Sequence, residues 1–157
     1  MGLKMMFGEA DSYKNSIYRE TVTTYKFISE LMIAMAKYNK IVDVLKTTSG
    51  DLFGYDLILN CENAVKLVQL KTTVNTSKWV IKNKLLKNIN GEVIVIYLSF
   101  FDENDWNFRY RILDKSKVVG VNILPDNGET IINETLLEPE RDIDHLAVYL
   151  FRELDFT

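Results

Sequence analysis

The chain has 157 residues, of which 47% are hydrophobic and 26% are charged, and its formal net charge is −3 at pH 7. Together with 2 Pro, 7 Gly and no low-complexity tract, this composition excludes a disordered chain and is typical of a globular domain with a real core. No apolar run approaches the roughly 20 residues of a membrane span, and the N-terminus lacks the apolar stretch of a signal peptide. The lone Cys61 excludes an intrachain disulfide and a multi-cysteine zinc site. We therefore expect a single cytoplasmic domain over residues 1–157, without membrane contact.

Charge is distributed unevenly along the chain. Residues 61–91 carry six lysines and one acid, a net charge of +5, whereas residues 126–157 carry nine acids and two arginines, a net charge of −7. A basic segment in an acidic chain is a candidate for nucleic-acid contact, although two solvated faces of opposite sign give the same pattern. Four lysines of this segment are expected to contact phosphates without regard to base sequence, or else to form the wet side of a helix: Lys78, Lys82, Lys84 and Lys87.

The first half of the chain predicts a helix followed by three strands. Residues 1 to about 11 are expected to form an irregular leader, and Asp11 or Ser12 to cap one amphipathic helix, or two consecutive ones, reaching about Asn39. Short strands are predicted at residues 41–45, 55–60 and 65–72, with a tight turn between the second and the third.

The second half predicts further strands and a terminal helix. In chain order we expect an extended piece at 79–81, a lysine-rich helix at 83–88, a strand buried on both faces at 92–101 and a half-buried strand at 107–113. We then expect a short helix or strand at 115–121, a short strand at 130–133 and a final helix at 142–155. This order predicts an α/β fold with a central mixed β-sheet flanked by helices.

Three polar residues interrupt the otherwise apolar hairpin of the second and third strands. Asp56 opens the second strand, while Gln69 and Lys71 share one face near the end of the third. Hydrolysis of a phosphodiester needs a divalent cation, and hard cations prefer carboxylate and carbonyl oxygens. A glutamate from the first helix, best Glu30 and otherwise Glu20, would add a second negative charge. The alternative for Lys71 is a structural ion pair with Asp56.

The order of these residues resembles that of a known superfamily. A helix glutamate, then Gly-Tyr-Asp-Leu-Ile at 54–58, then Val-Gln-Leu-Lys-Thr-Thr at 68–73, is similar to the PD-(D/E)XK nucleases. The resemblance is to the branch in which Gln replaces the acid of the (D/E)-x-K element. It implies a restriction-endonuclease-like core, a helix followed by a mixed sheet whose second and third strands carry the two motifs.

The resemblance also implies roles for individual residues. Asp56 corresponds to the metal-binding aspartate, Gln69 to the second metal ligand and Lys71 to the catalytic lysine, and Glu30 resembles the helix acid. Thr72 and Thr73 follow the lysine and are expected to contact phosphate.

The implied activity is that of a DNA endonuclease dependent on Mg²⁺ or Mn²⁺, of homing, restriction, junction-resolving or defence type. A chain of this size has little room for a separate recognition domain, so a dimer or larger homo-oligomer is expected. Because Gln69 removes one negative charge from the site, the alternative is a catalytically inactive nuclease-fold module that binds DNA or a protein partner.

Overall fold

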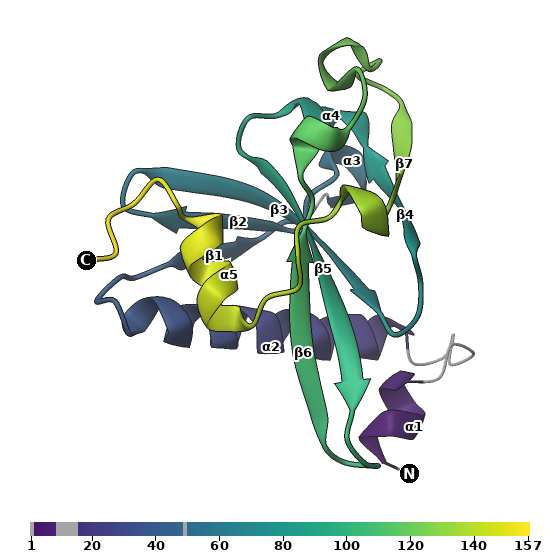
Figure 1. Ribbon diagram of the computed structural model, residues 1–157, viewed down its shortest axis with the longest axis vertical. Helices are drawn as coiled ribbons and strands as arrows, with labels where there is room; N and C mark the ends of the chain where they lie inside the picture. Colours follow the sequence, from purple (N-terminus) through teal and green to yellow (C-terminus); the bar gives the residue numbers. More distant parts are fainter. Residues whose placement is uncertain (1, 9–15, 49) are drawn as a thin grey trace.

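The structure, a computed structural model, describes residues 2–8, 16–48 and 50–157, so Asp11 and Ser12 lie outside the described residues. The fold is α/β, with a five-stranded mixed sheet flanked by helices (Figure 1). The sheet order is β1-β2-β3-β5-β6, and every neighbouring pair is antiparallel except β3 and β5. The strands are β1 (Asp43–Lys46), β2 (Leu57–Cys61), β3 (Ala64–Thr73), β5 (Gly91–Phe100) and β6 (Trp106–Ile112).

The parallel pairing of β3 with β5 requires a crossover connection between them. This connection contains β4 (Lys78–Lys82) and the short helix α4 (Asn83–Lys87). β4 does not join the main sheet but pairs with β7 (Glu129–Asn133) in a separate two-stranded ribbon. The crossover therefore places the β4–β7 ribbon beside the sheet rather than within it.

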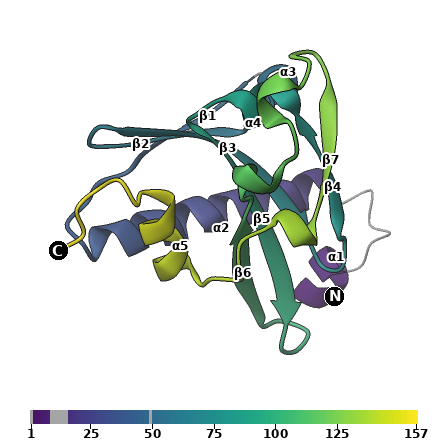
Figure 2. The same ribbon diagram turned by 45° about the horizontal axis from the view of Figure 1, so that its top comes forward.

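Alternating side chains of β5 divide the core into two layers. Ile94 and Ile96 pack with the helices α2 (Ser16–Ala36) and α5 (Ile143–Leu150), whereas Val93 and Val95 pack with α4 and the β4–β7 ribbon. Figure 2 shows α5 beside α2, with α4 away from both. The prediction that this strand is buried on both faces is confirmed.

The N-terminal segment differs from the predicted leader. Leu3–Gly8 forms a helix, α1, whose Phe7 is buried and stacks on Trp106 with ring centroids 5.1 Å apart. Because the segment is too short for a periodic pattern to be distinctive, its helix depends on this tertiary packing. Trp106 thus packs against this helix.

The first long helix ends earlier than predicted, at Ala36. The amides of Tyr38, Asn39 and Lys40 bond back to carbonyls of the last turn, and Asn39 adopts a positive φ of 58°, a geometry that terminates a helix. On its apolar face Phe27, Leu31 and Met35 are buried, whereas Ile17 and Tyr25 near its start are more than half exposed.

Two later segments also differ from prediction. Residues 115–121 form no continuous element but contain the 3₁₀ turn Lys115–Lys117 and the beginning of a second turn, Val121–Ile123. The terminal helix ends at Leu150 rather than at residue 155. Every helix among the described residues is too short or too polar to cross a bilayer.

Candidate functional site

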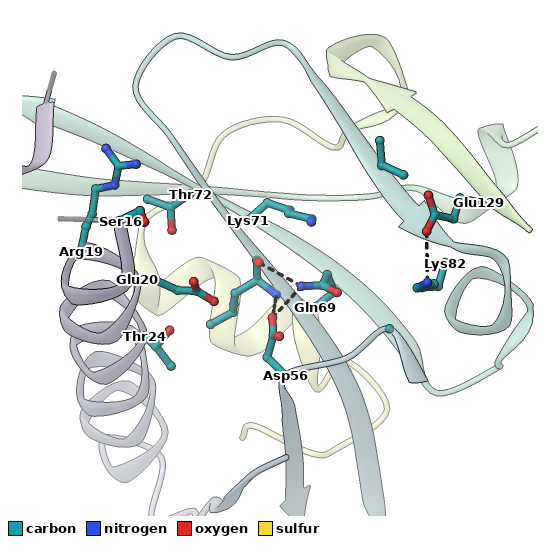
Figure 3. A pocket seen from close by; sticks show the side chains of 13 residues that line it. Ser16, Arg19, Glu20, Thr24, Asp56, Gln69, Lys71, Thr72, Lys82 and Glu129 are labelled. Carbon is teal, nitrogen blue, oxygen red and sulfur yellow. Dashed lines mark hydrogen bonds and ion pairs between the residues drawn. The ribbon is translucent and has the colours of Figure 1, made fainter. Parts of the chain in front are cut away.

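A cleft opens where β3 extends beyond the end of β2. Leu57, the first residue of β2, pairs with Val68, so residues 69–73 of β3 continue past β2 while they still pair with β5. The cleft has a volume of about 680 Å³ and is lined by residues of α2, β3 and the β4–β7 ribbon (Figure 3). An open strand edge presents backbone polar groups that a ligand can use.

Asp56 binds this open edge through its side chain. Its backbone extends the β2 ladder by one residue, since its N–H donates to the Val68 carbonyl at 2.8 Å. Its Oδ2 accepts a hydrogen bond from the Leu70 amide at 2.9 Å and another from Gln69 Nε2 at 2.7 Å. Asp56 therefore fixes the position of the Gln69 side chain and satisfies an N–H of β3 that lies beyond the end of β2.

The turn before Asp56 requires a glycine. The short helix α3 (Gly50–Phe53) ends at Gly54, which has a φ of +83°. A Cβ at this position would lie 2.6 Å from the Cβ of Lys82. Gly54 thus allows both the left-handed turn and the close approach of β4 that narrows the cleft.

Helix α2 supplies the opposite wall of the cleft. Ser16, Glu20 and Thr24 recur at four-residue spacing and line it, and Figure 3 shows the Glu20 carboxylate directed toward β3. Within the described part of the chain, neither Glu20 nor Lys71 forms an ion pair. A carboxylate and an ammonium group are therefore both open to a ligand in this cleft, and the alternative of a structural Asp56–Lys71 pair is not observed.

Glu30, the preferred glutamate of the sequence prediction, does not line this cleft. Its carboxylate accepts hydrogen bonds from Lys26 and from the buried Tyr110 hydroxyl, and it is not among the residues that line the cleft. Burial, followed by the hydrogen bond to Glu30, raises the pKa of Tyr110, so the phenol remains a donor. The glutamate of α2 that lines the cleft is Glu20, ten residues earlier and about 15 Å away along the axis.

The side chains present fit a hard divalent cation in their chemistry. Asp56 and Glu20 carry carboxylates, and the Leu70 carbonyl, which accepts from Gln69 Nε2 at 3.2 Å, adds a neutral oxygen. The amide of Gln69 points its nitrogen toward Asp56, because a carboxylate can only accept. Among the described residues there is no cluster of three or more His, Cys, Asp or Glu that could hold a metal.

Two of the four predicted phosphate-binding lysines form ion pairs within the chain. Lys87 pairs with Asp126 at 2.6 Å, and Lys82, which does line the cleft, pairs with Glu129 at 3.1 Å. These contacts join the basic segment to the acidic C-terminal part of the same chain. The charge asymmetry of the sequence is thus partly neutralised within the molecule. Lys78 and Lys84 are exposed but do not line the cleft.

The two threonines after Lys71 have different surroundings. Thr72 lines the cleft, and its hydroxyl lies 3.4 Å from that of Thr23 on α2. Thr73 is buried, and its hydroxyl accepts from the Thr76 amide at 2.6 Å in a tight turn. Thr72 is therefore placed to meet a ligand, whereas the Thr73 hydroxyl closes a turn.

Sequence reasoning missed the contribution of Arg19 and of the β4–β7 ribbon. Arg19, Val80 and Glu129 line the cleft, but none belongs to the hairpin motif. The four-residue spacing of Ser16, Glu20 and Thr24 was the available signal for a polar stripe on α2. The pairing of Lys82 with Glu129 has no local signal, because the two residues lie far apart in the sequence.

Comparisons of the chain with protein-family models, with curated proteins and with solved structures found no match.

Proposed function

We propose that the chain is a metal-dependent endonuclease that hydrolyses DNA phosphodiester bonds in the cleft beside β3. One observation carries the proposal. Asp56, Gln69 and Lys71 line a single cleft together with a helix carboxylate, Glu20. These are the residue types that phosphodiester hydrolysis needs: acidic oxygens for a cation, a lysine near the attacked phosphate and an open path for a strand.

The topology supports the proposal independently of the side chains. A helix precedes three antiparallel strands, the second strand follows Asp56 directly, the third carries Gln69 and Lys71, and a fourth runs parallel to the third. This is the arrangement that the resemblance to the PD-(D/E)XK nucleases implies. We propose on this basis a restriction-endonuclease-like core.

Each residue of the cleft has a proposed role. A bound Mg²⁺ or Mn²⁺ would lower the pKa of water and neutralise charge on the phosphate. Asp56 and Glu20 would hold the cation, Gln69 would keep Asp56 in place, and Lys71 would orient the water and stabilise the added negative charge. The water oxygen would bond to phosphorus as the bond to the leaving oxygen breaks. The water would release one proton to solvent, and the leaving oxygen would take one proton from solvent.

Cleavage of supercoiled plasmid DNA with Mg²⁺ or Mn²⁺ tests this proposal. The wild-type protein should nick the plasmid, and Lys71→Ala should slow nicking by about 100-fold or more while the protein remains folded. Lys117→Ala removes the same charge from an exposed 3₁₀ turn and should leave the rate unchanged. Equal rates for wild-type protein and Lys71→Ala would contradict the proposal.

One observation favours a second function, that of an inactive nuclease-fold module. Gln69 donates to Asp56, so position 69 adds no negative charge to the carboxylates of Asp56 and Glu20, where an acid at this position would add one. A module of this kind would bind DNA or a protein partner without cutting. Absence of cleavage on duplex, single-stranded and branched DNA, together with no heat of cation binding, would establish this alternative over the enzyme.

A further inference from the structure

A second, smaller pocket adjoins the cleft. Its volume is about 160 Å³, and Arg19 and Thr72 line both spaces. Figure 3 shows these two residues at the end of the cleft opposite Lys82 and Glu129. Because ligand pockets commonly measure about 300 Å³ or more, the second pocket has room for one small group such as a phosphoryl group rather than for a whole nucleotide.

The two pockets differ in charge. The cleft is lined by three carboxylates, those of Glu20, Asp56 and Glu129, alongside three cationic side chains. The second pocket has Arg19 as its only charged lining residue among those described, and its other polar walls come from Thr72, Thr73, Asn75 and Thr76. The charges that line the cleft therefore balance, whereas the single positive charge among the described lining residues of the second pocket favours an anion.

Arg19 has donors to spare for such an anion. Its Nη1 makes one long hydrogen bond, 3.4 Å to the Phe7 carbonyl, and no carboxylate of the described residues pairs with it. A guanidinium has five N–H donors in a fork that matches phosphate geometry. The Phe7 contact ties the side chain to α1, which limits the entropy that phosphate binding would cost.

We propose that the second pocket binds the phosphate next to the scissile one on the cleaved strand, with Arg19 and Thr72 as its ligands. The proposal rests on the nuclease function proposed above. It predicts that a strand must continue past the cut site into this pocket for efficient cleavage. A dinucleotide, which has a single phosphodiester, cannot fill both positions.

The first experiment measures phosphate binding alone. Inorganic phosphate is titrated into the protein while NMR monitors the backbone amide signals. In the wild-type protein the Thr76 and Asn75 signals should shift. The shifts should be lost in Arg19→Gln, reduced in Arg19→Lys, and retained in Arg109→Gln, which removes the same charge from a β6 residue paired with Glu140. Equal shifts in wild-type protein and Arg19→Gln, or no shifts at all, would overturn the proposal.

The second experiment measures the dependence of cleavage on strand length. The wild-type protein should cleave a hexanucleotide at least about 10-fold faster than a dinucleotide, which is the gain expected from one charge-assisted hydrogen-bonded contact. Arg19→Gln should lose this preference. Thr72→Val should also lose it, and because valine keeps the shape of threonine, this variant tests the subsite if the arginine variant folds poorly. A length preference that survives in both variants overturns the subsite and leaves the nuclease function standing. A wild-type protein that cleaves nothing refutes the nuclease function, while the phosphate titration still decides whether the pocket binds phosphate.

Discussion

At the scale of single residues, two glutamates of α2 have different surroundings. Glu20 faces the cleft without an ion pair among the described residues, whereas Glu30 accepts from Lys26 and from the buried Tyr110 hydroxyl. One carboxylate is thus placed for a ligand and the other for stability.

This difference predicts opposite effects of the same substitution. Glu20→Gln should lower the rate of plasmid nicking by about 100-fold and leave the free energy of unfolding within about 0.5 kcal/mol of wild type. Glu30→Gln should lower the free energy of unfolding by about 1–2 kcal/mol, because the buried phenol loses a charged acceptor, and should leave nicking unchanged. Nicking assays and urea denaturation of both variants measure these effects. A loss of nicking in Glu30→Gln but not in Glu20→Gln would show that Glu30, and not Glu20, acts in cleavage.

Gln69 affects the stability of the cation-free protein. Its Nε2 donates to Asp56 Oδ2 at 2.7 Å, a contact that a glutamate would replace with repulsion between two carboxylates. Without divalent cation at pH 8, Gln69→Glu should lower the free energy of unfolding by about 2 kcal/mol. Excess Mg²⁺ should reduce this difference in stability between the variant and the wild-type protein.

Urea denaturation with and without Mg²⁺ measures this effect. Asn122→Asp adds the same charge at an exposed position of a 3₁₀ turn and should change the stability little. A Gln69→Glu protein as stable as wild type in the absence of cation would show that the amide does not hold Asp56.

At the scale of elements, the hairpin of β2 and β3 was predictable and the wall opposite it was not. Alternation of apolar residues predicted both strands and put Gln69 and Lys71 on one face. Helical periodicity shows which face of α2 is apolar but not which end of the helix meets the open edge of β3. Glu20 and Glu30 were therefore left as alternatives.

The β4–β7 ribbon depends on a contact that no local pattern predicts. Buried Asn83 donates from Nδ2 to the Pro125 carbonyl at 2.8 Å, and its Oδ1 accepts from the Thr130 hydroxyl at 2.6 Å. One amide thus joins the start of α4 to the turn before β7 and to β7 itself. This contact holds the ribbon against the cleft.

Asn83→Ala should therefore loosen the ribbon before it unfolds the sheet. We expect a loss of about 1–3 kcal/mol in the free energy of unfolding, since two partners lose their hydrogen bonds. Hydrogen exchange should accelerate at Val80 and Ile132 more than at Ile94 of β5. Asn122→Ala serves as an exposed control, and uniform exchange across both sheets would contradict a separate ribbon.

At the scale of the whole molecule, opposite charges of segments far apart in the sequence pair with one another. Lys66 on β3 pairs with Glu153 after α5 at 2.7 Å, beside the buried Glu92 of β5. Burial raises the pKa of the Glu92 carboxyl, while the nearby Lys115, Lys66 and Arg152 oppose the shift and Glu153 adds to it.

This raised pKa predicts how stability depends on pH. The folded protein keeps the Glu92 proton at pH values where the unfolded chain, with a carboxyl pKa of about 4.3, has lost it. The contribution of Glu92 to the free energy of unfolding therefore falls as pH rises from that value through the raised pKa. Glu92→Gln should remove this decline and be more stable than wild type at pH 8. Urea denaturation between pH 4.5 and 8 gives the slope of the free energy of unfolding against pH for both proteins. Identical slopes would contradict a raised pKa of the buried Glu92 carboxyl.

The proposed function requires that Asp56 and Glu20 hold a divalent cation beside Lys71. Crystals grown with Mn²⁺ test it most directly, because anomalous scattering locates the ion without reference to activity. We expect one ion in the cleft whose ligands include an Asp56 carboxylate oxygen, and we expect this ion to be absent in Asp56→Asn. A cleft without an anomalous peak at a saturating Mn²⁺ concentration would contradict it.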